Sequence, residues 1–145
     1  MCSKHSCVEE VVKSILDAQD DALDNQCDIS CHRSIQDLVS PTTGNGYDTV
    51  PFILFDKKGN PFKGVGVQGT TQLNCVESFI FRVTSVKDSC VTLELLTTES
   101  DSVCKSPCEQ LDGENVQNIE RTGICITVDL SCFCAISCLP AISLF

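Results

Sequence analysis

The stretch DLSCFCAISCL, residues 129–139, places Cys132, Cys134 and Cys138 within seven residues. An apolar residue or a cysteine occupies every even position from Ile124 to Cys138, which predicts a strand rather than a helix. In an extended strand these thiols share one face, and side chains two residues apart are separated by about 6.6 Å. Because a relaxed disulfide needs Cβ atoms about 3.8 Å apart, Cys132 and Cys134 are poor partners for each other. Each sulfur therefore pairs with another strand, another segment or another molecule, or stays unpaired.

The chain on the N-terminal side of this stretch also has the pattern of an antiparallel β protein. Period-two alternation predicts strands at residues 49–55, 77–86 and 90–97, before a closing strand at 124–140. The glycine-rich segment at residues 61–69 predicts a bulge or a close approach by its backbone. The expected fold class is mainly β, an antiparallel β-sandwich or open barrel with one N-terminal amphipathic helix.

That helix is predicted at residues 7–23, where apolar side chains recur at spacings of three and four. Ser6 is the expected N-cap, and Glu9 completes a capping box. The main interpretation is that the helix packs on the rest of the domain. The alternative is that it forms a partner-binding arm.

Length and charge limit the classes of protein that fit. A chain of 145 residues is expected to form a single domain over 1–145, with a helix-bearing, cysteine-rich N-terminal arm at 1–35 and a β-sandwich core at 48–140. Polar residues at 98–118 predict an exposed loop. A net charge of −10 argues against nucleic acid or an anionic membrane as partner, because both bind a basic face. No apolar run predicts a signal peptide or a membrane span.

The 12 cysteines need an explanation in a chain with no predicted signal peptide, because thiols stay reduced in the cytosol. Three explanations are open: the thiols bind metal, they are buried as apolar side chains, or they oxidise later in another environment. Six lie in polar segments where an inert thiol has no packing role, and these are the candidates for disulfide cross-linking: Cys2, Cys7, Cys27, Cys31, Cys104 and Cys108. The other six are candidates for core positions or intramolecular bonds: Cys75, Cys90, Cys125, Cys132, Cys134 and Cys138.

Zinc binding is the alternative interpretation, with Cys27, Cys31 and His32 as candidate ligands. The spacing permits zinc without being distinctive, because structural zinc sites usually combine two close ligand pairs. Nucleophilic catalysis requires a thiol beside an oriented base, and no known nucleophile signature surrounds any cysteine. No catalytic residue and no cofactor are predicted, and an enzyme is not expected.

Three segments carry a resemblance to a known family. ICITVDLSCFCAISCL (124–139), PFILFDKKGNPF (51–62) and CVEEVVKSI (7–15) resemble the Bacillus-type spore coat protein family Y/Z, with the greatest likeness to its branch of cysteine-rich exosporium basal-layer proteins Y. The resemblance implies a structural protein, synthesised in the mother cell and placed on the spore surface, in the exosporium or the outer coat. It also implies assembly of hexameric units, with itself and with related coat and exosporium proteins, into two-dimensional arrays held by disulfides.

This resemblance offers an answer to the crowding of sulfur. The chain would fold in a reducing cytosol, assemble through noncovalent contacts, and be locked by disulfides as conditions become oxidising. Relatives often carry a His- or Lys-rich tail, whereas residues 140–145 here are the apolar PAISLF, so Leu144 and Phe145 are expected to dock on the core or on a neighbour. Twelve cysteines allow about ten thousand complete pairings, and the sequence selects none of them.

Overall fold

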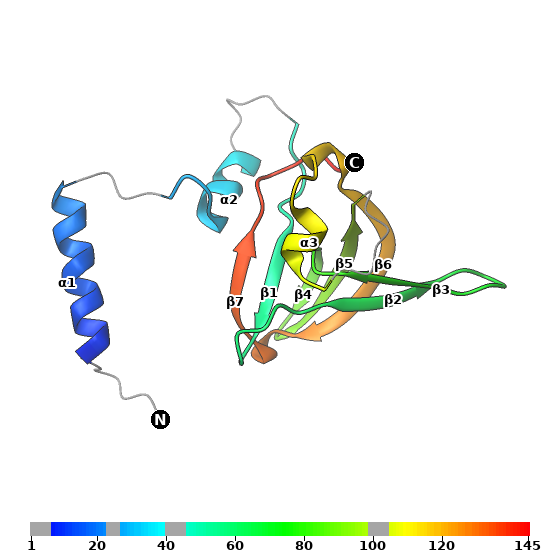
Figure 1. Ribbon diagram of the computed structural model, residues 1–145, viewed down its shortest axis with the longest axis horizontal. Coiled ribbons are helices and arrows are strands. Elements are labelled where there is room, and N and C mark those ends of the chain that lie inside the picture. Colours follow the sequence, from blue (N-terminus) through cyan, green and yellow to red (C-terminus); the bar gives the residue numbers. More distant parts are fainter. Residues whose placement is uncertain (1–6, 23–26, 40–45, 99–104) are drawn as a thin grey trace.

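A computed structural model of the chain describes residues 7–22, 27–39, 46–98 and 105–145 (Figure 1). The helices are α1 (Cys7–Ala22), α2 (Cys31–Val39) and α3 (Pro107–Leu111), with short 3-10 helices η1 (Val116–Asn118) and η2 (Leu130–Cys132). The strands are β1 (Phe52–Asp56), β2 (Gly64–Gln68), β3 (Asn74–Ser78), β4 (Phe81–Lys87), β5 (Cys90–Thr97), β6 (Glu120–Asp129) and β7 (Phe133–Cys138).

The strands form two antiparallel sheets. A five-stranded sheet has the order β6-β5-β4-β1-β7, and β2 pairs with β3 in a separate two-stranded sheet. The mainly β, antiparallel fold class with an N-terminal helix is thus confirmed, in an open form, because the sheet does not close into a barrel. The expected division into an arm and a core stays a prediction.

The expectation of one closing strand at 124–140 is wrong, because the chain turns in the middle of it. The Asp129 carboxylate accepts a hydrogen bond from the Ser131 backbone N–H at 2.9 Å, and η2 follows. Such local side-chain bonds compete with a β ladder. β6 therefore ends at Asp129 and β7 begins at Phe133, on the opposite edge of the sheet. Cys132 lies in the turn, so the three thiols do not share one strand face.

The predicted strand at 77–86 is also two strands, which belong to different sheets. The buried Ser78 hydroxyl accepts hydrogen bonds from the Ile80 backbone N–H and from Gln110 Nε2, each at 2.9 Å. It also donates to the carbonyl of Leu96. This local bond to Ile80 replaces ladder pairing, and it turns the chain from β3 into β4.

The expected exposed loop at 98–118 is partly structured. Residues 99–104 lie outside the described residues, but α3 and η1 follow them. The Ser106 hydroxyl caps α3 by accepting from the Glu109 N–H at 3.1 Å, with Pro107 in the first turn. Gln110 is buried, where its Oε1 accepts from the Phe79 N–H at 2.9 Å. The Gln110 side chain satisfies a backbone N–H inside the core, so its polarity did not indicate that it was exposed.

The main core lies between the five-stranded sheet and the β2–β3 hairpin, which crosses the sheet and projects beyond it (Figure 1). Its buried members are Phe52, Leu54, Phe81, Val91, Leu93 and Leu95. A Cβ added to Gly64 would lie 2.6 Å from Phe81 Cε1, and one on Gly66 would lie 2.3 Å from Ile124 Cγ2. Both distances are too short for a side chain. The close backbone approach predicted from the glycines is therefore confirmed.

A second core cluster involves the last residues of the chain. It contains Ile80, Leu96, Ile119 and Ile142, with Leu111, Leu139 and Leu144 packed against it. Thr49 and Ile142 form an antiparallel bridge that holds this segment beside β1. Leu144 thus docks on the core, as expected, and the Phe145 ring lies 4.8 Å from the guanidinium carbon of Arg82.

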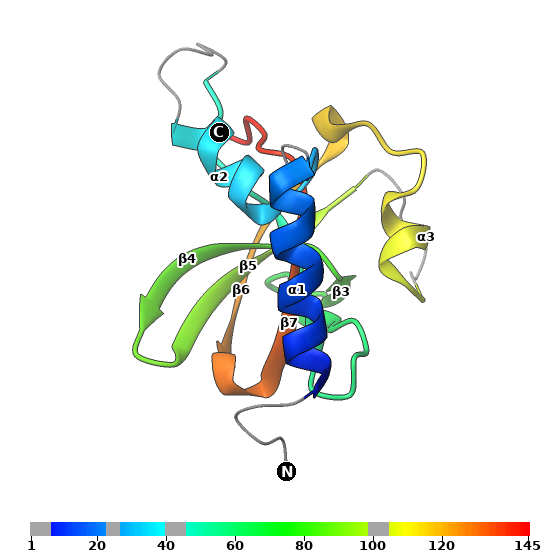
Figure 2. The same cartoon turned by 90° about the vertical axis from the view of Figure 1, so that its left-hand side faces the viewer.

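Helix α1 does not pack on the sheets. Every side chain described in it, from Cys7 to Asp21, is exposed. Figures 1 and 2 show α1 apart from the sheet, on the side of edge strand β7. The main interpretation, packing on the domain, is wrong, and the alternative of a partner-binding arm remains. The predicted N-cap Ser6 lies outside the described residues, and no helix within them is long and apolar enough to cross a membrane.

Candidate assembly surface

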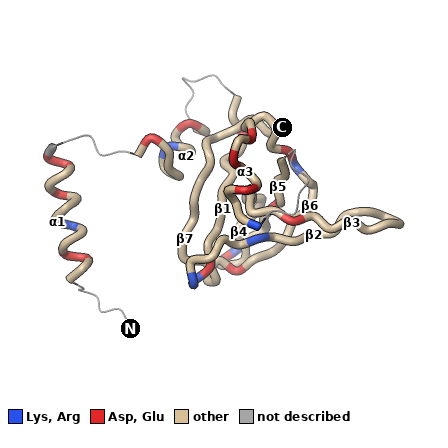
Figure 3. The backbone as a smooth tube through the Cα atoms, in the orientation of Figure 1, with Lys and Arg blue, Asp and Glu red and all other residues tan. Residues whose placement is uncertain are grey.

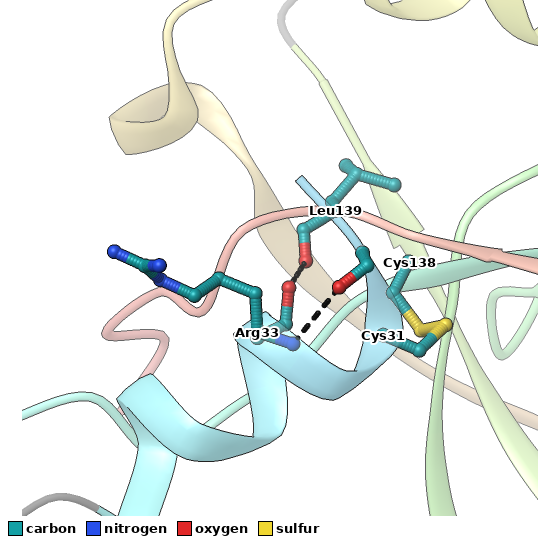
Figure 4. Close-up of a disulfide and its surroundings, with 6 residues drawn as sticks. Cys31, Arg33, Cys138 and Leu139 are labelled. Atoms are coloured by element: carbon teal, nitrogen blue, oxygen red, sulfur yellow. Dashed lines mark hydrogen bonds between the residues drawn. A yellow bond between two sulfur atoms is a disulfide. The ribbon is translucent and has the colours of Figure 1, made fainter. Parts of the chain in front are cut away.

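A disulfide ties the N-terminal part of the chain to the sheet. Cys31, the first residue of α2, is bonded to Cys138, the last residue of β7, across 107 residues of sequence (Figure 4). The Ser34 hydroxyl, which is buried, donates to the Leu139 carbonyl at 2.7 Å. One covalent bond and one buried hydrogen bond therefore dock α2 on the end of β7.

Helix α2 forms because its first turn is capped locally. The Ser30 hydroxyl accepts a hydrogen bond from the Arg33 backbone N–H at 3.0 Å, which satisfies one of the donors that a helix leaves free at its start. Arg33 also lies 3.8 Å from Asp37, one turn along the exposed face. The cap sets the start of the helix, and this places Cys31 where its side chain meets β7.

The disulfide changes the expected cross-linking set. Cys31 was a candidate for bonds between molecules, but its partner is Cys138 of the same chain. Cys138, a candidate for an intramolecular bond, has one. Of the remaining cross-linking candidates, Cys7, Cys27 and Cys108 are exposed free cysteines, whereas Cys2 and Cys104 lie outside the described residues.

Five other cysteines, expected in the core or in intramolecular bonds, are exposed free cysteines here: Cys75, Cys90, Cys125, Cys132 and Cys134. The expectation of burial is wrong for these five. Cys125 alternates with the half-buried Ile124 and Ile126 on edge strand β6, so its side chain is on the opposite face. Cys134, on the other edge strand, donates its thiol to the Asp56 carbonyl at 2.8 Å while remaining exposed. No other part of the described chain covers the sulfurs of Cys125 and Cys134.

One exposed thiol adjoins a concave surface. Cys108 of α3 lines an open pocket of about 470 Å³. The other lining residues are Ile53, Pro107, Leu111, Asp112 and Gly113. The lining is mostly apolar, so the pocket offers packing surface beside a thiol.

The alternative zinc site is not assembled in the described part of the chain. The sulfur of Cys31 is in a disulfide and so is not available as a thiolate ligand. His32 Nε2 lies 3.0 Å from Gln36 Nε2, on the exposed side of α2. Across residues 7–22, 27–39, 46–98 and 105–145, no three histidine, cysteine or acidic side chains converge to hold a metal ion. The proposed set of Cys27, Cys31 and His32 is therefore corrected.

A buried charge network that was not predicted from the sequence joins β4, β5 and β6. Glu94 is 1% exposed, and its carboxylate accepts from Arg82 Nε at 2.6 Å, Arg121 Nε at 3.1 Å and the Gly123 N–H at 2.9 Å. Burial alone raises the pKa of Glu94, but these donors outweigh it and hold that pKa below its ordinary value. The signal in the sequence was a glutamate between Leu93 and Leu95, a charge inside an otherwise apolar strand.

The network is covered by the end of the chain. The Phe145 ring lies 4.5 Å from the Arg121 guanidinium carbon as well as over Arg82. The Asp48 carboxylate accepts from the Leu144 and Phe145 backbone N–H groups at 2.9 and 3.1 Å. Although burial alone raises the pKa of Asp48, these bonds and one from Thr49 lower it overall. The strands that carry exposed thiols are thus held together by a buried ion-pair network and by the docked C-terminal residues.

Comparison with known proteins identifies the family of this chain. Residues 2–141 match the family described as Spore coat protein Z. A curated relative, "Spore coat protein Z" of Bacillus subtilis (strain 168), is 38% identical over 146 aligned residues, which cover 92% of this chain and 88% of the relative. No solved structure matches the chain significantly. The family match over nearly the whole chain, together with 38% identity to a relative across most of both sequences, shows that the chain belongs to the spore coat protein Z family.

Proposed function

We propose that this chain is a structural protein of the bacterial spore surface that assembles with copies of itself and with other coat proteins, and that disulfides between chains reinforce the assembly. Family membership supports the coat role. The observation that carries the cross-linking role is the set of eight exposed free cysteines in the described part of the chain. Exposed thiols oxidise readily with other accessible thiols once reducing conditions end.

The distribution of these thiols favours bonds between molecules. They lie on α1, before α2, on β3, at the start of β5, on α3, on β6, in η2 and on β7, that is, over most of the surface. A metal centre needs ligands that converge, and a catalytic thiol needs one oriented base beside it. Thiols that point outward in many directions suit neither chemistry. They suit a subunit that contacts several neighbours.

Assembly and locking are separate steps in this proposal. Noncovalent contacts arrange the subunits, for which hexameric units in a two-dimensional array are the geometry that the family resemblance implies. Disulfides then form between thiols that these contacts have brought together. Because each subunit is held by several neighbours, even individually weak contacts give a layer that resists heat and denaturant kinetically. The location, exosporium or outer coat, and the Y branch within the family stay predictions.

Electron microscopy of the purified protein with and without reductant tests assembly directly. We expect extended ordered layers in both conditions, because noncovalent contacts build the layer. Heating in denaturant should disperse the reduced layer and leave the oxidised layer intact. Small dispersed particles in both conditions would refute assembly by this chain alone.

Substitution of exposed thiols tests cross-linking. A variant with Cys7, Cys27 and Cys108 changed to serine should still form layers but disperse more readily than the parent on heating in denaturant, because only five of the eight exposed thiols remain. The matched control changes Cys31 and Cys138 to alanine, which removes the intrachain bond and leaves the exposed thiols in place. The control should form as many disulfide-linked oligomers as the parent on non-reducing electrophoresis, whereas the serine variant should form fewer. Equal resistance of the serine variant and the parent would remove these three residues from the cross-linking role.

A further inference from the structure

Helix α1 carries a coiled-coil seam that nothing in the described chain covers. Val8, Val11, Ile15 and Ala18 follow the alternating three-four spacing of heptad positions a, d, a and d. Their side chains are all exposed, with exposed fractions of 72%, 57% and 51% for Val8, Val11 and Ile15. An amphipathic helix this short is marginal in water without a packing partner. The seam therefore calls for an apolar partner surface.

The charges of α1 are arranged so that a like-charged helix can approach. Figure 3 shows that most of the charged residues along α1 are acidic, and the whole chain has a net charge of −10. Positions b, c and f, which face away from the seam, hold Glu9, Glu10, Lys13, Leu16, Asp17 and Asp20. The flanking e and g positions hold Cys7, Val12, Ser14, Gln19 and Asp21. Of these flanking residues, Asp21 alone is charged, and it lies at the end of the helix, so two copies of α1 can meet along the seam with little repulsion.

The same pattern disfavours a lipid surface. Helices that lie on membranes carry lysine and arginine beside the apolar face, where they meet anionic headgroups. The polar face of α1 has one lysine, Lys13, which forms an ion pair with Glu9 at 2.9 Å. Its other charges are acidic and would be repelled. A protein helix with an equally uncharged flank is the occupant that fits.

We propose that α1 packs along this seam against α1 of a second copy of the chain. The inference rests on the proposed function, because it names one of the contacts that build the assembly. The seam spans only about two heptads, fewer than the three to four that mark a self-sufficient coiled coil. The pair is therefore weak in isolation and effective where other contacts hold the same two chains together.

Two neighbouring residues of α1 provide a matched test. Ile15 is 51% exposed and lies at the a position, whereas Leu16 is 48% exposed and lies at b, outside the seam. Ile15→Glu and Leu16→Glu add the same charge to the same helix, and glutamate is a good helix former. In full-length protein kept in reductant, we expect Ile15→Glu to weaken self-association at least tenfold by analytical ultracentrifugation. Leu16→Glu should change it less than twofold, with both variants keeping the parent's circular dichroism.

A charge-swap pair identifies the partner surface. Ile15 lies at the middle of α1, so it is opposite its counterpart in a parallel pair and within about one helical turn of it in a centred antiparallel pair. Ile15→Glu and Ile15→Lys should each associate weakly alone, and an equimolar mixture should recover association because opposite charges then meet across the seam. Failure of the mixture to recover would overturn helix-to-helix pairing and point to another surface of the neighbour.

The remaining outcomes separate this inference from the proposed function. If the parent assembles and Ile15→Glu assembles equally well, the α1 pairing is overturned while the structural function stands. Equal losses from Ile15→Glu and Leu16→Glu would also overturn it, because the effect would then follow charge rather than the seam. A parent that remains monomeric at all concentrations would refute both the pairing and the proposed self-assembly.

Discussion

Glu94 shows how much of this fold depends on a single buried carboxylate. It joins Arg82 of β4, Arg121 of β6 and the Gly123 backbone from its place on β5, so three strands meet at one side chain. Breaking a buried ion pair by removing one partner typically costs about 3 to 5 kcal/mol, because the remaining charges lose their compensation. Arg121 is partly exposed, which favours the low end of that range.

Glu94→Gln should therefore lower the free energy of unfolding by about 3 kcal/mol at pH 7. The pKa of Glu94 lies below its unfolded value of about 4.3, so its stabilisation is fully present above that pH and is lost as pH falls through the folded pKa. The two proteins should then converge in acid, where the parent's carboxyl is protonated. Urea denaturation from pH 7 down to pH 2.5 measures this, and a difference that stays constant with pH would contradict the charge network.

Gly66→Ala tests the close approach of the hairpin to the sheet. The new Cβ would meet Ile124 Cγ2 at 2.3 Å, so we expect a loss of about 1 to 3 kcal/mol in the free energy of unfolding. The control is the same substitution in an Ile124→Ala background, where the contacting methyl group is gone. Denaturant unfolding of the four proteins gives the coupling free energy. No coupling would mean that the glycine serves chain flexibility instead.

At the scale of elements, α1 and α2 have opposite relations to the sheet. Helix α2 is held by the Cys31–Cys138 disulfide and by Ser34, whereas α1 exposes its apolar face. The order of these helices along the chain gives no sign of the difference. It arises because the cysteine at the start of α2 meets the end of β7, and α1 has no such contact in the described chain.

The disulfide of α2 should stabilise the single chain. Closing a loop of about 100 residues removes up to about 4.7 kcal/mol of unfolded-state entropy, and measured effects are typically about 2 to 4 kcal/mol. Changing both Cys31 and Cys138 to alanine should lower the free energy of unfolding by that amount under oxidising conditions. Parent and variant should become nearly equal in reductant. Cys108→Ala is the control, with no loss expected in either condition, and a difference that persists in reductant would point to lost packing instead.

At the scale of the whole molecule, the net charge opposes the assembly that the surface thiols would reinforce. Figure 3 shows acidic residues distributed along the chain, while the projecting end of the β2–β3 hairpin carries no charge. Subunits with such a charge repel one another until salt screens the repulsion, since the Debye length falls from about 30 Å at 0.01 M to about 8 Å at 0.15 M salt.

Self-assembly should consequently strengthen as salt rises. Light scattering of the reduced protein between 0.01 and 0.15 M sodium chloride should show a lower critical concentration at the higher salt. The Leu16→Glu variant, with one more negative charge outside the seam, should show a slightly steeper dependence. Assembly that weakens with salt would indicate contacts built on opposite charges, contrary to the acidic surface described here.

Much of the local structure could be predicted from the sequence. The α1 helix, the β4–β5 hairpin and the close approach at Gly64 and Gly66 follow from side-chain periodicity and from residue types whose backbone preferences are strong. The family resemblance came from contiguous motifs, and comparison with known proteins confirmed it. These features depend on neighbours along the chain, so the sequence carries them directly.

What the sequence by itself determined, then, is the class of fold, the family and the presence of an amphipathic helix. The tertiary structure decided which cysteines meet and which side chains are covered. Ser78 and Asp129 turn the chain where period-two alternation had predicted continuous strands, and the turn at Asp129 separates β6 and β7, which lie at opposite edges of the sheet. Cys134 and Cys138 both lie on edge strand β7. Cys138, at its end, is bonded to Cys31 of α2, whereas Cys134 stays exposed. Alternation specifies that a side chain faces one side of a strand, but only the packing of distant segments specifies what, if anything, lies on that side.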